Sequence, residues 1–387
     1  MRISQNILDK ITIIVFLGCI GLPPILMILN LNTGAIKTEN RITGITPGFE
    51  FHYANDKGLA GNLKDLYIAT ARYINKFDQY FSSSFSFRSE LLHLHNYIKG
   101  SVMGVDPLPL KVVEGSNGWL FPGDSHSNVI KETKGIVNFS RAELHKLETV
   151  ITERNRWLVT KGVVSYLAVA PDKLSVYGDQ LQIKPSPKKT KAMQLDSLST
   201  ALKSNFINLK ERLNPAQILY MKTDSHWNDY GAFLAYQSLM DMVKRDFPDV
   251  PVAQLNDFSI DTLTVYQQDL TKLLSMERRD SKIVLKRKHP GRSKYVAEKS
   301  VPIPLRYDLN PALYEQRYKS DINALKVVVF RDSFTSNLEQ FIVESFGEVL
   351  FIWSHEFNQK IIETEKPDIV IEIIIEREVD LLLRDKW

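Results

Sequence analysis

Val327-Val328-Val329-Phe330-Arg331-Asp332-Ser333-Phe334 decides the fold, because an apolar, β-branched run leads directly into a polar turn. Runs of this kind without polar alternation predict parallel strands that are buried on both faces. Alternation of such strands with helices predicts an α/β fold, with a parallel sheet covered by helices on both sides. Other strands are expected at 163–169, 217–220, 349–352 and 369–375, helices at 141–159, 195–213, 229–247 and 337–346, and a hairpin at 111–121.

Ser333, directly after a predicted strand, is the first candidate for chemistry. In open α/β sheets, functional residues lie at the carboxyl ends of strands. Asp224 and His226 stand two residues apart, just before the predicted helix at 229–247. A serine hydroxyl needs a base to take its proton, and the base needs an acid to hold its tautomer. Ser333, His226 and Asp224 are therefore candidates for nucleophile, base and orienting acid, in an order that the chemistry permits.

Each of these residues also has a purely structural explanation. Ser333 and Asp224 can cap the helices that follow them, and His226 can pack beside Trp227. A metal site needs three or four ligands, and no third ligand accompanies Asp224 and His226 at a useful spacing. No metal and no cofactor is therefore assigned to the chain.

The composition is that of a globular protein of one large domain with accessories, or of two domains, with 387 residues, 44% hydrophobic and 24% charged. A formal net charge of +4 argues against a dedicated nucleic-acid binder but permits contact with an anionic polymer. Two basic segments are interpreted either as solvated loops or as a groove wall for a polyanionic glycan. They contain Arg278, Arg279, Lys282, Lys286, Arg287, Lys288, Arg292 and Lys294, and Lys184, Lys188, Lys189 and Lys191.

The N-terminus predicts a membrane anchor. Arg2 and Lys10 lie on the amino side of an uncharged run, Ile11 to Asn30, and about 20 apolar residues can span a bilayer. We expect an uncleaved anchor over 1–31, a linker and helical lead-in over 32–110, with helices at 63–80 and 89–98, and an outer domain over 111–387. Cys19, the single cysteine, lies in the anchor, so the outer domain has no disulfide.

A family resemblance runs from about Phe85 to Arg377. The segment Asp224 to Asn228, followed by Gly231 and Ala232, resembles the acid–base motif of the AlgX/AlgJ-type alginate O-acetyltransferases, a permuted SGNH-hydrolase-like family. Arg331-Asp332-Ser333-Phe334 resembles the nucleophile motif of that family. Further matching pieces are Gly115 to Phe121, Ala170-Pro171-Asp172-Lys173, Asp269-Leu270 and Lys366 to Val370.

The resemblance implies a circularly permuted SGNH-hydrolase-like α/β/α domain, anchored in the inner membrane and facing the periplasm. It implies that Ser333 carries an acetyl ester, that His226 acts as base and then acid, and that Asp224 orients His226. The acceptor would be a hydroxyl of an exopolysaccharide, with acetyl groups supplied by a membrane-bound O-acyltransferase. An acetylesterase with the same three residues, and a non-catalytic glycan-binding scaffold, are the alternatives.

Two departures from the SGNH pattern concern the oxyanion hole. Arg331 stands where SGNH hydrolases have glycine, and Glu376-Arg377 follows the predicted strand at 369–375 where they have asparagine. The backbone N–H of Ser333 is a suitable first donor to an oxyanion. Asn337 and Arg377 are the candidates for a second donor, and the sequence does not choose between them.

Overall fold

A computed structural model describes residues 48–84, 110–181, 189–197, 206–274, 276–308 and 310–384, with single positions at 10, 13, 14, 16–18, 21, 25, 98 and 103. The chain divides into two units, Met1–Gly104 and Val105–Trp387. The first contains η1 (Asn55–Lys57) and helix α2 (Gly58–Ser84), which includes the helix predicted at 63–80. The expected helix at 89–98 and most of the expected anchor fall outside the described residues. No described helix has the length and apolar character needed to cross a bilayer.

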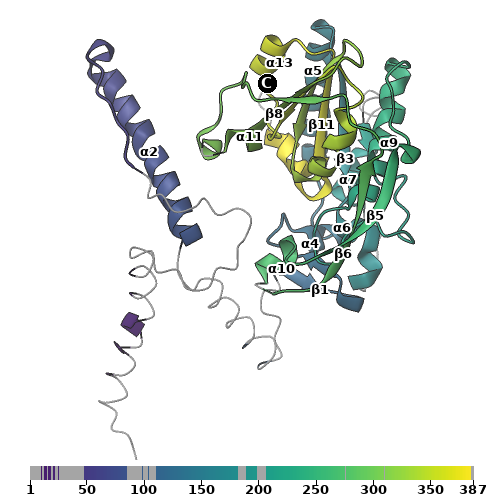
Figure 1. Cartoon of the computed structure of the whole chain (residues 1–387), viewed down its shortest axis with the longest axis horizontal. Helices are drawn as coiled ribbons and strands as arrows, with labels where there is room; N and C mark the ends of the chain where they lie inside the picture. Colours follow the sequence, from purple (N-terminus) through teal and green to yellow (C-terminus); the bar gives the residue numbers. More distant parts are fainter. Residues whose placement is uncertain are drawn as a thin grey trace, which may run out of the picture. The chain divides into compact units, whose positions relative to one another are not determined.

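A seven-stranded sheet forms the centre of the second unit (Figure 1). Its strand order is β4-β3-β11-β9-β10-β8-β7, and the pairs from β4 to β10 are parallel. The last two pairs, β10 with β8 and β8 with β7, are antiparallel. The strands are β3 (Val164–Ala170), β4 (Phe206–Asn208), β7 (Lys294–Val296), β8 (Glu315–Lys319), β9 (Lys326–Arg331), β10 (Glu348–Ile352) and β11 (Ile369–Ile375).

The predicted parallel sheet is therefore a mixed sheet. The buried positions of β8 are Glu315 and Arg317. Arg317 forms ion pairs with Glu348 and Glu365, and Glu315 lies 3.9 Å from Arg317 and accepts from the N–H groups of Ser300 and Val301. A strand that buries paired charges carries no apolar run, so the pattern that identified β9 and β11 could not identify β8.

Side chains alternate between the two faces of the sheet, as strand geometry requires. On one face, Val327 and Val329 of β9 pack with residues of helix α9 (Asp229–Asp246). On the other, Val328 and Phe330 pack with α5 (Arg141–Thr160) and α13 (Gln359–Glu365). The result is an α/β/α sandwich, and the helices lie along the sheet in Figure 1.

Two small antiparallel sheets and several short helices complete the unit. The sheets are β1 (Val112–Glu114) with β2 (Leu120–Pro122), the expected hairpin, and β5 (Phe258–Val265) with β6 (Asp280–Arg287). The remaining helices are η3 (Ser116–Gly118), α4 (Val129–Thr133), α6 (Lys173–Tyr177), η4 (Gly178–Leu181), α7 (Lys191–Leu195), η5 (Leu255–Asp257), α10 (Asp269–Leu273), η6 (Leu305–Tyr307), α11 (Pro311–Tyr314), η7 (Ser333–Asn337), α12 (Glu339–Ile342) and η8 (Glu376–Arg384).

Three predicted elements are wrong. The helix expected at 195–213 is replaced at 206–208 by β4, because these residues pair with β3. The strand expected at 217–220 is a loop, because its one backbone pairing with a described residue is an isolated antiparallel bridge from Tyr220 to Trp227. The helix expected at 337–346 is divided between the 3-10 helix η7 and the short helix α12.

Candidate active site

Ser333 follows β9, at the carboxyl edge of the sheet, and begins η7. Asp332 holds this turn: one carboxylate oxygen accepts from the N–H of Phe334 at 2.8 Å and the other from the N–H of Ile375 in β11 at 2.7 Å. Asp332 is thus the cap of η7, so the capping explanation for Ser333 does not apply. The Ser333 hydroxyl is left to make contacts outside the turn.

Asp224 and His226 lie in the loop that enters α9. The cap of α9 is Asn228, whose side chain accepts from the N–H groups of Tyr230 and Gly231 at 3.0 Å. Asp224 is therefore no helix cap. Its Oδ1 accepts instead from the backbone N–H of His226 at 2.9 Å, which folds the carboxylate back onto the imidazole.

Two side chains join this acid–base loop to the nucleophile turn. The indole Nε1 of Trp227, which is fully buried, donates to the carbonyl of Phe334 at 2.9 Å. The amide of Asn337 donates to Asp229 at 2.8 Å. The packing partner of His226 is the ring of Phe334, with centroids 4.9 Å apart. These contacts fix the distance between base and nucleophile across 107 residues of chain.

The three residues predicted from the sequence meet in one hydrogen-bonded line. Nδ1 of His226 lies 2.7 Å from Oδ1 of Asp224, and Nε2 lies 2.8 Å from Oγ of Ser333. A carboxylate only accepts hydrogen bonds, so Nδ1 carries the proton and Nε2 of the neutral ring accepts from the serine hydroxyl. This arrangement can remove the proton of Ser333 as the hydroxyl attacks an electrophile.

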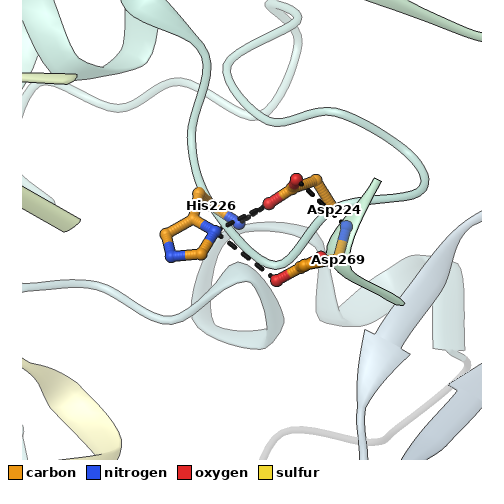
Figure 2. A group of neighbouring side chains, drawn as sticks. All are labelled: Asp224, His226 and Asp269. Atoms are coloured by element: carbon orange, nitrogen blue, oxygen red, sulfur yellow. Dashed lines mark hydrogen bonds and ion pairs between the residues drawn. The ribbon is translucent and has the colours of Figure 1, made fainter. Parts of the chain in front are cut away.

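Asp269, at the start of α10, is a second carboxylate on the same imidazole (Figure 2). Its Oδ2 lies 3.5 Å from Nδ1 of His226, and its Oδ1 accepts from the N–H of Ser225 at 2.8 Å. Burial by itself lowers the pKa of His226, but the hydrogen bonds and charges of Asp224 and Asp269 outweigh it and raise that pKa to about 9. The imidazolium is thus strongly stabilised, as a general base requires after it takes a proton.

Lys173, the first residue of α6, makes hydrogen bonds to the acid–base loop. Its ammonium is fully buried and donates to three carbonyls: those of Leu120 at 2.7 Å, Lys222 at 2.8 Å and Asp224 at 2.9 Å. A charged ammonium has three N–H donors, and all three are used. Lys173 therefore ties the β1–β2 hairpin to the segment that carries Asp224.

Among the residues that the structure describes, two groups have side chains suited to a divalent cation, Asp224 with His226 and Asp269, and Asp332 with His355 and Glu378. The expectation that Asp224 and His226 have no third ligand nearby is therefore wrong, since the fold brings Asp269 to them. In the first group, however, Nδ1 faces the carboxylates and Nε2 faces Ser333. That orientation directs the imidazole towards proton transfer with the serine.

The sequence did not identify the roles of Asp269 and Lys173. Both stood in motifs of the family resemblance, Asp269-Leu270 and Ala170-Pro171-Asp172-Lys173, and this was the only signal that marked them. Of the two candidates for a second oxyanion donor, Asn337 is engaged with Asp229, whereas Arg377 follows β11 beside the nucleophile turn.

Comparison with solved structures shows the fold. Bacillus cereus PatB1 with a sulfonyl adduct matches with a TM-score of 0.50 and 17% identity, over 71% of this chain and 97% of that chain. The O-acetyltransferase domain of Pseudomonas putida AlgJ gives 0.43 and 17%, over 70% and 93%. Pseudomonas aeruginosa AlgX gives 0.37 and 15%, over 69% and 62%. A search of curated proteins finds no match.

A family model identifies the sequence relationship. Residues 112–301 match the SGNH hydrolase-like domain of the acetyltransferase AlgX. The matched segment contains Asp224, His226, Asp269 and Lys173, and it ends before Ser333. Over these residues, just under half of its length, the chain is similar to the SGNH hydrolase-like domain of the acetyltransferase AlgX.

Proposed function

We propose that this protein is an O-acetyltransferase that places acetyl groups on hydroxyls of a polysaccharide outside the cytoplasm, through an acetyl ester on Ser333. The supporting observation is the line from Ser333 through His226 to Asp224, with separations of 2.8 and 2.7 Å, in a chain similar to an acetyltransferase domain. A nucleophile, a base and an orienting acid at hydrogen-bond distance are the parts that acyl transfer requires.

The reaction proceeds in two halves. Oγ of Ser333 attacks the carbonyl carbon of an acetyl donor while its proton moves to Nε2 of His226, and the donor's leaving group departs with that proton. An acceptor hydroxyl then gives its proton to Nε2 and attacks the acetyl-serine, and Ser333 recovers a proton from His226. Asp224 and Asp269 stabilise the imidazolium that forms in each half.

The donor side requires a partner, because acetyl-CoA is a cytoplasmic compound. We propose that a membrane-bound O-acyltransferase supplies the acetyl group, and that the run Ile11 to Asn30, with Arg2 and Lys10 before it, anchors the chain in the inner membrane with residues 111–387 in the periplasm. The place of the acid–base segment before the nucleophile agrees with a circularly permuted SGNH domain.

The acceptor is proposed to be an anionic, alginate-like glycan, and the basic segment at 278–294 contributes at one end only. Arg278 and Arg279 precede Asp280, which accepts from the N–H of Thr223 at 2.7 Å, next to Asp224. Lys294, at the other end, pairs through β8 with the start of β10. The start of β10 pairs with Lys326, the first residue of β9. Because β9 rises about 3.3 Å per residue towards Ser333, the Lys294 end of the segment lies at least about 20 Å from Ser333.

Ser333 provides the direct test of the mechanism. The intact protein is mixed with a chromogenic acetyl ester, and the acetylated residue is located by mass spectrometry. We expect one acetyl group on Ser333, and none after Ser333→Ala. Ser336→Ala is the matched control, because Ser336 lies in the same turn and accepts from Arg331 at 3.2 Å. An acetyl adduct that persists in Ser333→Ala would remove Ser333 from the reaction.

The second half of the reaction separates a transferase from an esterase. The acetylated protein is given uronate-containing or neutral oligosaccharides, and acetylated sugar and free acetate are measured. A transferase yields acetylated oligosaccharide, more of it with uronates, and the preference weakens at high salt because Arg279 is exposed. Free acetate with every acceptor, together with removal of acetyl groups from acetylated polymer, would support the esterase.

A further inference from the structure

The carboxyl ends of β9 and β11 lie side by side at the point where the strand order reverses. From β9 the chain continues to β10 on one side, and it then returns to β11 on the other. Ligand sites of open α/β sheets form at such a point. The first residues after these strands are Asp332 and Ser333 on one side, and Glu376 and Arg377 on the other. These four residues meet at the same edge.

The attack of Ser333 on a carbonyl produces an oxyanion that needs hydrogen-bond donors. The backbone N–H of Ser333 has no partner among the described residues, as is usual at the start of a helix. The next N–H, that of Phe334, is occupied by Asp332 at 2.8 Å. The amide of Asn337 is occupied by Asp229 at 2.8 Å. Of these three donors, only the N–H of Ser333 is available, and we look for a second donor in the neighbouring segments.

Arg377 is buried, with 8% of its surface exposed, and it uses few of its donors. Its Nη1 donates to Asp172, which follows β3, and this is the only side-chain hydrogen bond of Arg377 to a described residue. Nε and Nη2 have no hydrogen bond to a described residue, and neither is a fully buried atom. A guanidinium has five N–H donors, so donors of Arg377 remain for a ligand.

Arg377 lies beside the residue that follows the nucleophile. Its Cζ lies 5.5 Å from the ring of Phe334, the residue after Ser333, and the same ring lies 4.9 Å from that of His226. Burial and the charge of Arg377 lower the pKa of His126, whereas Asp269 acts in the opposite direction. The charges of Arg377 and Asp269 therefore both act on His126.

We propose that Arg377 is a catalytic residue that donates, together with the N–H of Ser333, to the oxyanion of the tetrahedral intermediate. This rests on the function proposed above. As Oγ bonds to the carbonyl carbon, the electrons of the C=O bond move to oxygen and the serine proton moves to His226. The oxyanion then re-forms C=O and expels the leaving group, which takes the proton from His226. Arg377 donates hydrogen bonds throughout and transfers no proton.

The experiment compares Asp172→Asn with Asp172→Asn/Arg377→Met in the intact protein, so that loss of the guanidinium does not leave a buried carboxylate unpaired. The rate of Ser333 acetylation by p-nitrophenyl acetate is measured, with the melting temperature of each variant. Removal of one oxyanion donor costs about 10²–10³-fold in kcat. We expect a loss of about 100-fold from Arg377→Met in this background, little change in KM, and an unchanged pH profile for His226.

Arg377→Lys is the second variant, because it keeps the positive charge beside Asp172 and offers a single donor group in a different position. We expect a melting temperature close to wild type and a loss in kcat that is smaller than that of the methionine variant. Acetylation within threefold of the Asp172→Asn control, or full activity of Arg377→Lys and Arg377→Met alike, would overturn the assignment. If wild type itself never acquires an acetyl group on Ser333, the proposed function fails first, and the role of Arg377 fails with it.

Discussion

Asp269→Asn should move the pH dependence of the reaction to lower pH, because it removes one of two negative charges beside His226. Nδ1 lies 2.7 Å from Asp224 and 3.5 Å from Asp269, and together these residues raise the pKa of His226 to about 9 against the effect of burial. A general base acts as the neutral imidazole. With a pKa of about 9, roughly 1% of the enzyme is in that form at pH 7.

The expected shift follows from the loss of one nearby charge. An opposite charge at this range changes a pKa by about one unit or more. One unit lowers the pKa of His226 to roughly 8, raises the neutral fraction at pH 7 about tenfold, and corresponds to about 1.4 kcal/mol. The weaker base transfers its proton less effectively, so the plateau rate at high pH should fall. The two rate profiles should therefore cross.

The assay is kcat/KM for acetyl-ester turnover between pH 6 and pH 10. Asparagine keeps an oxygen that can accept from the N–H of Ser225, which preserves the loop. Asp261→Asn is the control, since Asp261 lies on β5 and pairs with Lys286 at 2.7 Å. An apparent pKa for Asp269→Asn equal to that of wild type would refute the reasoning, because it would mean that the charge of Asp269 does not act on His226.

Three further predictions concern the support of the site and of the core. Lys173→Met removes three hydrogen bonds to backbone carbonyls and should lower the free energy of unfolding by about 3 kcal/mol. We expect a melting temperature lower by roughly 6–12 °C and a reduced kcat. An unchanged melting temperature would contradict this prediction. Gly231→Ala places a Cβ 2.5 Å from the carbonyl oxygen of Leu219, so it should displace the loop that carries His226 and lower both the melting temperature and the activity. Gly178→Ala is the control, because its Cβ would have no neighbour within 4 Å, and it should change neither quantity. Glu132 is buried with neither oxygen in a hydrogen bond to a described residue, and its nearest charge is the ammonium of Lys191 at 4.0 Å. Burial raises the pKa of Glu132 to about 8. Between about pH 4.5 and 8 the folded state therefore holds a proton that the unfolded state has lost, so Glu132 makes the stability of the protein fall as pH rises. Denaturant titrations should show that Glu132→Gln stabilises the protein by about 1–3 kcal/mol at pH 9 and has little effect at pH 4.

The sequence by itself determined the central strands and the candidate chemistry. The apolar runs at 327–330 and 369–375 predict strands buried on both faces, because 327–330 has no polar side chain and 369–375 has one, Glu372. The helix at 229–247 follows from its own periodicity and agrees with α9 to within a residue at either end. Serine, histidine and aspartate were recognisable as nucleophile, base and acid because their roles follow from residue type.

Only the tertiary structure decided which polar groups meet. β4 is a strand because three residues pair with β3, and β8 can bury Arg317 because Glu348 and Glu365 from other segments neutralise its charge. Asp269 lies 44 residues beyond Ser225, and Arg377 lies 205 residues beyond Asp172, yet each pair is in contact. Local periodicity encodes which side chains are buried. The strand order decides which loops converge at one edge of the sheet, and those contacts leave no periodic signal in the sequence.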